Sequence, residues 1–177
     1  QRQMCIRDSG QENLRKSLQI AHICPVRYKY MLSKRERGVF MTNEQYYDCI
    51  QPYQNACQIM RAKLEVLNGS LYQKSSVSPI HNIQERIKSK KSIEKKLEKL
   101  GHSDSVQNAK DHLRDIAGIR VICYFIDDIY NLVNALKRQS ELIFIREKDY
   151  IQNPKPNGYR SFHVIIAVPV YYLDTME

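Results

Sequence analysis

GIRVICYF, residues 118–125, is the stretch that decides the fold of this chain. Successive side chains of a strand point to opposite faces, and here both faces are largely apolar, with Arg120 near the beginning as the exception. A strand that is apolar on both faces is typical of the interior of a covered sheet. We therefore predict a strand over 119–125 at the centre of a mixed sheet, with helices packed against it.

A long helix is predicted ahead of this strand. Apolar residues recur at steps of three and four from Thr42, its N-cap, to about Leu67, and Asn68-Gly69 predicts its end. Pro52 predicts either a kink in this helix or its true start.

The remaining patterns alternate between helix and strand. Residues 80–88 fit a strand or a helix, whereas 89–101 fit a helix that Ser89 caps. Residues 127–136 fit a helix, and 141–146 and 161–168 fit strands. This order predicts one α+β or α/β domain with a mixed sheet.

Length and composition limit the class of protein. The chain has 177 residues, of which 42% are hydrophobic, enough for one domain with a core and too few for two sizeable ones. No apolar run approaches the roughly 20 residues of a membrane span. The five cysteines show no CxxC spacing. We therefore predict a cytoplasmic protein with free thiols and no membrane partner.

The net charge of +9 first suggests a nucleic-acid binder. Of the 28 basic and 19 acidic residues, nine and three lie in 1–40, which leaves 19 and 16 for 41–177. One dense basic cluster remains there, formed by Arg86, Lys88, Lys90, Lys91, Lys95, Lys96 and Lys99. A local cluster suits a polyphosphate at least as well as a duplex, so we predict no duplex nucleic acid as a partner.

Residues 1–40 show no sustained periodicity. We predict that they are a non-native or disordered N-terminal extension and that native translation begins at Met41; a weakly helical tail is the alternative. The folded domain is then expected over 41–177.

KPNGYRSFHVII, residues 155–166, places polar side chains in front of an apolar run. Asn157-Gly158 predicts a turn. Tyr159 fits either the core or a platform on which a base stacks, and His163 alone is more often a structural hydrogen-bonding residue than a catalyst. Polar side chains crowded at one strand entrance nevertheless predict a site.

Other polar residues surround the predicted central strand. Arg86 and Lys88 share one face if 80–88 is a strand. Asp115 could cap the backbone or hold Mg²⁺, and Arg120 could pair with Asp115 or lie over a purine. Cations, a carboxylate and flat side chains together predict an enzyme that handles nucleotide polyphosphates.

Several short motifs occur in a fixed order: Ser78-Pro79-Ile80, Arg86-Ile87-Lys88, Ser92-Ile93, DIAGIR (115–120), FIDD (125–128), KDYI (148–151) and GYRSFH (158–163). They resemble the synthetase domain of RelA/SpoT-type proteins, most of all the stand-alone small alarmone synthetases. The resemblance covers about Met41 to Val170. It implies an α+β fold, a nucleotidyltransferase-like mixed sheet flanked by helices. It also implies transfer of pyrophosphate from ATP to the 3′-hydroxyl of GDP or GTP, giving AMP and ppGpp or pppGpp.

The resemblance implies a role for each matching residue. Asp115 would be catalytic and would bind Mg²⁺. The ATP donor would be bound by Arg86 and Arg120 around adenine and by Lys88, Ser92 and Lys96 at its phosphates. The GDP or GTP acceptor would be bound by Lys148, Lys155, Tyr159, Arg160 and His163, with Tyr159 stacked on guanine. REKD, residues 146–149, matches the basic version of a motif associated with acceptor preference, which favours GTP as one accepted substrate.

One motif of the family is not reached. The family's second metal-binding glutamate lies in a later Glu-x-Gln-Ile/Leu-Arg-Thr motif, and this sequence ends at Asp174-Thr175-Met176-Glu177. By this resemblance, 41–177 is an alarmone synthetase domain that is incomplete at its C-terminal end. The full-length form could be a homo-oligomer. The alternative functions are a catalytically inactive nucleotide- or RNA-binding domain and a structural or partner-binding domain.

Asp115 alone offers Mg²⁺ one carboxylate, which suffices for binding but positions the phosphates poorly. We therefore expect this chain to bind ATP weakly and to make little or no alarmone, whereas a chain extended through the Glu-x-Gln motif is active. A turnover assay on both lengths with ATP and GDP measures this, with Asp115→Asn in the longer chain as the control. Full activity of the shorter chain would contradict the expectation, and an unaffected Asp115→Asn variant would remove the metal assignment.

Overall fold

The computed structural model describes residues 17–25, 41–75 and 77–172, and for 17–25, 74 and 75 it describes the backbone alone. The elements along the chain are β1 (Ser17–Pro25), α1 (Asn43–Ser75), β2 (Ile80–Ile87), α2 (Lys90–Lys99), α3 (Val106–His112), β3 (Ala117–Cys123), α4 (Ile126–Lys137), β4 (Ile143–Asp149) and β5 (Ser161–Val168). The predicted α+β class is confirmed. Residues 80–88, which fit either a strand or a helix, form strand β2 over most of their length.

The strands form one five-stranded sheet in the order β2-β3-β1-β5-β4. Strand β1 runs parallel to β5, and the other neighbouring pairs are antiparallel. The sheet is therefore mixed, as predicted. Strand β3 lies in its interior, paired on both sides, and ends at Cys123 because Phe125 already serves as the N-cap of α4.

The middle position of the sheet belongs to β1 and not to β3. The nine residues of β1 come from the segment expected to lie outside the folded domain, so that expectation is wrong for Ser17–Pro25. Pairing with β1 satisfies the backbone groups along the facing edges of β3 and β5, which would be costly to leave unpaired inside the molecule. Residues 1–16 and 26–40 lie outside the described residues, and native translation from Met41 stays a prediction.

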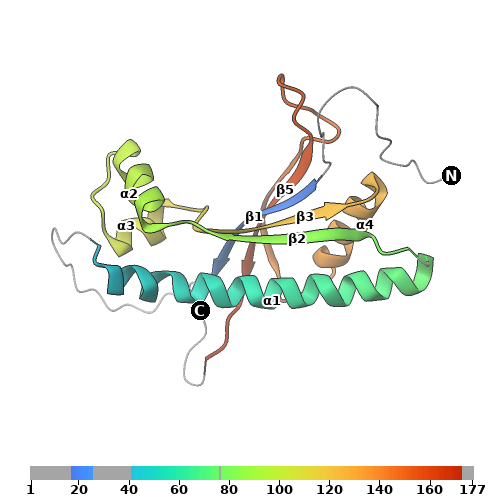
Figure 1. Ribbon diagram of the computed structural model, residues 1–177, viewed down its shortest axis with the longest axis horizontal. Coiled ribbons are helices and arrows are strands. Elements are labelled where there is room, and N and C mark those ends of the chain that lie inside the picture. Colours follow the sequence, from blue (N-terminus) through green and yellow to red (C-terminus); the bar gives the residue numbers. More distant parts are fainter. Residues whose placement is uncertain (1–16, 26–40, 76, 173–177) are drawn as a thin grey trace.

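Helices α1 and α4 lie along one face of the sheet, while α2 and α3 lie together at one end (Figure 1). The covered face carries the core, where Ile119 and Val121 of β3 and Val164 and Ile166 of β5 are at most 2% exposed. On its other face, β3 carries the exposed Arg120. The sheet therefore has one covered face and one face that is open at Arg120.

Helix α1 begins as its sequence predicts. Thr42 Oγ1 accepts a hydrogen bond from Gln45 N at 3.2 Å, and Thr42 N donates to Gln45 Oε1 at 3.0 Å. This reciprocal pair is a capping box. The predicted apolar face is also confirmed, since its buried members are Ile50, Tyr53, Cys57, Met60 and Leu64.

Helix α1 continues to Ser75, past its predicted end at Asn68-Gly69. Asn68 does not end the helix because its side chain ties the helix to β2: Asn68 Oδ1 accepts hydrogen bonds from Ile80 N and from Ser78 Oγ, each at 3.0 Å. Leu71, beyond Gly69, packs against the core. Pro52 lies inside the helix and does not mark its start.

Among the cysteines whose side chains are described, Cys49 and Cys57 are buried free thiols, and Cys123 is buried as well. Burial, with a smaller contribution from the charge of Glu85, raises the pKa of the Cys57 thiol to about 12. A search of the described helices finds none long and apolar enough to cross a membrane.

Two positions on α1 test how far this packing stabilises the fold. Leu64 is fully buried and Val66 is 72% exposed. We expect Leu64→Ala to lower the free energy of unfolding by about 2 to 5 kcal/mol, because it leaves a cavity in the core, and Val66→Ala to change it by less than about 0.5 kcal/mol. Urea denaturation followed by circular dichroism measures both. Equal losses at the two positions would contradict the assigned helix face.

Candidate active site

A row of polar side chains crosses the open face of the sheet. In the strand register, Arg120 and His163 both pair with Gln19 of β1, and Lys148 pairs with His163. Residues paired in this way point to the same face, so Arg120, His163 and Lys148 share one face. Neighbouring strands lie about 4.8 Å apart, so the backbones at Arg120 and His163, with β1 between them, are about 10 Å apart.

Arg86 lies on the same face of the sheet and is a diagonal neighbour of Arg120 on the adjacent strand. Its partner in β3 is Gly118, which precedes Arg120 by two residues. Diagonal neighbours of this kind are about 7 to 8 Å apart, and Gly118 places no side chain between them. This is the arrangement that an adenine ring held between two guanidinium groups requires. Opposite faces would have excluded it.

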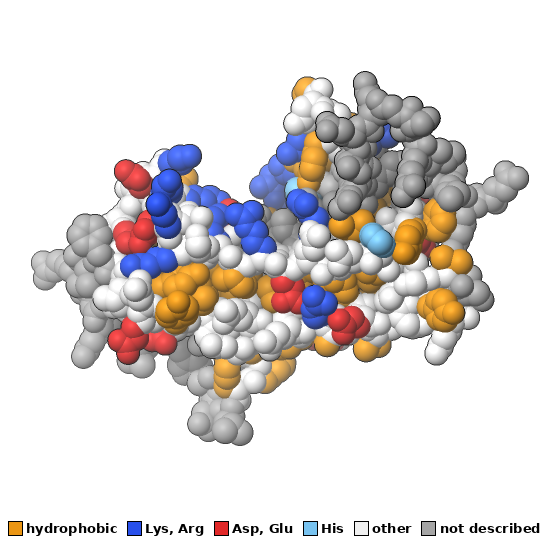
Figure 2. Space-filling model, viewed as in Figure 1, with side chains coloured by type: hydrophobic (Ala, Val, Ile, Leu, Met, Phe, Trp, Pro, Cys, Tyr) orange, Lys and Arg blue, Asp and Glu red, His pale blue; other side chains and the backbone are white. Residues whose placement is uncertain are grey.

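Figure 2 shows where this face is hollowed. Lys and Arg side chains gather on both sides of a notch that lies between the α2–α3 end of the molecule and the strands β4 and β5. The notch and the row of side chains together make this face the candidate active site.

Asp115 is the acidic group at the donor end of the site. Its Oδ2 lies 2.6 Å from Lys88 Nζ and 2.5 Å from Lys96 Nζ. Lys88 follows β2, and its backbone is fixed on both sides: Lys88 N donates to Ile116 O at 2.7 Å, and Tyr46 OH donates to Lys88 O at 3.1 Å. Two strand ends and helix α2 thus converge on one carboxylate.

The charges of the two lysines decide the ionisation of Asp115. Burial favours the neutral acid, but hydrogen bonds from Lys88 and Lys96 and their positive charges outweigh burial and lower the pKa of the Asp115 carboxyl below its usual range. The other oxygen, Asp115 Oδ1, is buried and has no hydrogen-bond partner among the described residues. A carboxylate oxygen with free lone pairs suits a hard cation such as Mg²⁺, which often takes only one or two protein carboxylates together with phosphates and water. The described residues contain no group of three or more His, Cys, Asp or Glu that could hold a metal ion, so phosphates and water would have to complete the coordination of a cation at Asp115.

The N-terminus of α2 lies next to this carboxylate. Ser89 is the N-cap residue, but its side chain does not cap the helix as predicted; instead Ser89 Oγ and Ser92 Oγ hydrogen-bond at 2.9 Å. The first turn of α2 contains no acidic residue. A helix N-terminus attracts anions through its free N–H groups and its dipole, and Lys88 and Lys96 add positive charge beside Ser92, so this part of the site favours an anion.

A tight turn builds the other end of the site. Gly158 has φ +77°, which few residues other than glycine adopt. Gly158 N donates to Lys155 O at 2.8 Å, and Lys155 N donates to Tyr159 O at 3.2 Å. Asn157 Oδ1 accepts from Tyr159 N at 3.2 Å. The predicted turn at Asn157-Gly158 is confirmed, and it places Lys155 beside Tyr159.

Three of the predicted acceptor residues meet here. The hydroxyl of Tyr159 and Nε2 of His163 are hydrogen-bonded at 3.0 Å. Lys155 Nζ lies over the Tyr159 ring, 5.1 Å from its centroid. Two further residues were predicted for the acceptor. Lys148 of β4 lies beside His163, because the two residues pair across β4 and β5, and Arg160 is exposed on the loop before β5.

Sequence reasoning missed Tyr150 as a member of this group. Lys155 Nζ lies 4.7 Å from the centroid of the Tyr150 ring, closer than to that of Tyr159. Its place in the KDYI motif was the available signal, but a tyrosine directly after a strand also fits the core, so no role was assigned to it.

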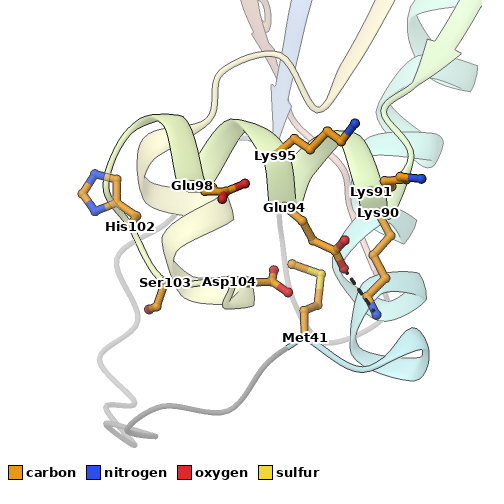
Figure 3. A pocket seen from close by; sticks show the side chains of 9 residues that line it. All are labelled: Met41, Lys90, Lys91, Glu94, Lys95, Glu98, His102, Ser103 and Asp104. Atoms are coloured by element: carbon orange, nitrogen blue, oxygen red, sulfur yellow. Dashed lines mark ion pairs between the residues drawn. The ribbon is translucent and has the colours of Figure 1, made fainter.

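A cavity of about 700 Å³ lies elsewhere, between α2, α3 and the start of α1 (Figure 3). It is lined by Met41, Lys90, Lys91, Glu94, Lys95, Glu98, His102, Ser103 and Asp104, none of which is a predicted site residue. Its lysines and carboxylates are mixed, and Lys90 pairs with Glu94 at 3.5 Å. The cavity uses the side of α2 that does not carry Ser92 and Lys96, so its size alone does not locate the chemistry.

A mixed sheet with helices on one face and basic, aromatic and acidic groups on the other is the architecture expected from the RelA/SpoT resemblance. Residues 85–176, more than half of the chain, match the family described as "Region found in RelA / SpoT proteins". The chain belongs to this family.

Individual relatives agree with this assignment. The chain is 42% identical over 125 residues to the GTP pyrophosphokinase YwaC of Bacillus subtilis, covering 71% of this chain and 60% of that protein. It is 29% identical over 130 residues to the GTP pyrophosphokinase YjbM of Bacillus subtilis, covering 73% of this chain and 60% of that protein. The chain thus spans about 60% of the length of these curated relatives.

Solved structures show the same fold. Small alarmone synthetase 2 from Bacillus subtilis has a TM-score of 0.63 at 38% identity, covering 76% of this chain and 67% of that one. Small alarmone synthetase 1 from Bacillus subtilis, bound to its product pppGpp, has a TM-score of 0.65 at 27% identity, covering 76% of this chain and 69% of that one.

The ion pairs of Asp115 predict a pH dependence of stability. Because the pKa of Asp115 is lower in the folded state than in the unfolded state, where it is about 3.9, its carboxylate stabilises the fold above that pH. This contribution is lost as the pH falls through the folded-state pKa. We expect Asp115→Asn to lower the free energy of unfolding by about 1 to 3 kcal/mol at pH 7, and by progressively less below about pH 4. Urea denaturation of both proteins between pH 7 and pH 3 measures the difference.

Asp48→Asn, at an exposed position of α1, is the control for the loss of one negative charge. A stability difference for Asp115→Asn that stays constant from pH 7 to pH 3 would show that the ionised carboxylate does not stabilise the fold.

Proposed function

We propose that this chain carries the donor and acceptor sites of a GTP pyrophosphokinase, which transfers pyrophosphate from ATP to the 3′-hydroxyl of GDP or GTP. The observation that carries the proposal is the shared face of the sheet. Arg86 and Arg120 lie at one end of the row and His163 at the other, about 10 Å from Arg120. A donor and an acceptor nucleotide bound at these two ends could bring their reacting groups together between them.

The donor end fits ATP. Arg86 and Arg120 would hold adenine between their planar guanidinium groups. Lys88, Lys96 and Ser92, with the N-terminus of α2, would hold the phosphates. Both arginines come from strands, so the sheet sets the distance between them before ATP arrives.

Asp115 would bind Mg²⁺ through its carboxylate. A bound Mg²⁺ supplies charge neutralisation and orientation for phosphoryl groups. Before nucleotide binds, Asp115 occupies both lysines through Oδ2. The triphosphate carries more negative charge than one carboxylate, so it would draw the lysines toward itself and leave both oxygens of Asp115 available to the cation.

The acceptor end fits a guanosine nucleotide. Tyr159 would stack on guanine, and Lys155, Arg160 and Lys148 would neutralise its phosphates. His163, held by the Tyr159 hydroxyl, would lie near the ribose. The 3′-oxygen would form a bond to the β-phosphorus of ATP as the bond from that phosphorus to the α-phosphate oxygen breaks, so that AMP leaves and the hydroxyl proton is released. The site need only position the groups and neutralise charge, since this reaction requires no covalent intermediate with the protein.

The names of the relatives support this proposal, because they are GTP pyrophosphokinases and one related structure holds pppGpp. The reaction uses nucleotides of the cytosol, and Cys49 and Cys57 are buried free thiols. We therefore propose a cytoplasmic location for the protein.

The two arginines provide the test of the donor site. We expect Arg86→Ala and Arg120→Ala each to weaken ATP binding about fivefold or more, because stacking on a base contributes about 1 to 3 kcal/mol. Arg138→Ala is the matched control, since Arg138 is an exposed arginine at the end of α4. Isothermal titration with a non-hydrolysable ATP analogue and Mg²⁺ measures the affinities.

Product analysis decides the reaction class. Any turnover with ATP and GDP should yield AMP and guanosine tetraphosphate in equal amounts. ADP as the product, or unchanged ATP affinity in both arginine variants, would contradict the proposal. Nucleotide binding without any AMP, also in a C-terminally extended chain, would favour the inactive binding domain.

A further inference from the structure

Tyr150 directly follows β4 and lies at the entrance of β5. Its backbone N donates to Ser161 O at 2.9 Å, which fixes it beside the first residue of that strand. The side chain is partly buried and is not among the residues that pack against the hydrophobic core. Core packing therefore does not explain why an aromatic ring stands here.

The ring of Tyr150 faces three residues of the acceptor end. Its centroid lies 5.2 Å from that of His163, with the ring planes at 89°, and 6.4 Å from that of Tyr159, with the planes at 61°. Lys155 Nζ lies 4.7 Å from the Tyr150 centroid and 5.1 Å from the Tyr159 centroid. Tyr150 is thus the common neighbour of Lys155, Tyr159 and His163.

These contacts solve a positioning problem at Lys155. The residue is exposed, and a long lysine side chain on a loop samples many rotamers that would have to be given up when it binds a phosphate. A cation within about 6 Å of an aromatic ring is attracted to the ring face. Two rings at this distance restrain the ammonium group before a ligand arrives.

We propose that Tyr150 is a positioning residue of the acceptor site: its ring holds the Lys155 ammonium group where it meets the phosphates of a guanosine nucleotide. The inference rests on the proposed function and adds a residue to which no role is otherwise given. The ring and not the hydroxyl carries the effect, because no described residue forms a hydrogen bond with the Tyr150 hydroxyl.

The test compares GDP binding by Tyr150→Leu and Tyr150→Phe. Leucine removes the ring and with it the cation–π contact to Lys155. We expect the dissociation constant for GDP to rise about 3- to 30-fold, which is the change in affinity that the energy of such a contact corresponds to. Phenylalanine keeps the ring and should leave the constant within about twofold, since it loses only the hydroxyl. ATP affinity should stay unchanged in both variants. Tyr72→Leu, at an exposed tyrosine of α1, is the control for removing a surface ring.

A double-mutant cycle separates positioning from general damage. Lys155→Met should weaken GDP binding, and adding Tyr150→Leu to it should have almost no further effect, because the ring acts through the lysine. Additive losses would overturn the proposal, and so would equal losses in the Phe and Leu variants. If the parent chain binds GDP and Tyr150→Leu binds it equally well, only the role of Tyr150 is refuted. If the parent chain fails to bind GDP, the proposed acceptor site and the role of Tyr150 are both refuted.

Discussion

The register of β3 between β2 and β1 is the constraint on which the site depends. Side chains alternate along a strand, so a slip of one residue would turn Arg120 toward the helices and Ile119 and Val121 toward the open face. Burying a residue such as Ile119 or Val121 stabilises the fold by about 1.5 to 3 kcal/mol. The same hydrophobic burial that selects the register therefore aims Arg120 and, through Gly118, Arg86 at the open face.

Charge imposes the second constraint. Lys88 and Lys96 are brought to one point by different elements, and without an anion between them their charges would repel. Asp115 supplies that anion at the end of the segment that leads into β3. A ligand rich in phosphate offers the lysines the same kind of contact, so the ion pairs that hold these elements together are also the ones that such a ligand would replace. In the proposed function, stability and nucleotide binding would therefore be coupled at this carboxylate.

The two ends of the site are built differently. The donor end depends on strand pairing and on a helix that packs against neighbouring elements, so its geometry comes from contacts between distant parts of the chain. The acceptor end depends mostly on one connection, where Gly158 permits the turn and Asn157 closes it. Rings from both sides of that connection then pack on Lys155. A sequence pattern can therefore indicate the acceptor end more directly than the donor end.

The sequence by itself determined the local elements: the capping box at Thr42, the buried face of α1, the turn at Asn157-Gly158 and the apolar strands β3 and β5. Each follows from a period, a cap or a backbone preference that acts over a few residues. The tertiary structure alone decided that β1 fills the middle of the sheet, that α1 runs past Asn68, that both lysines bind Asp115, and that Tyr150 stands beside Lys155. These outcomes depend on hydrogen bonds, charges and ring contacts between segments that only the folded chain brings together. Local sequence patterns carry no record of such contacts, because the partners are set by the packing of the whole sheet.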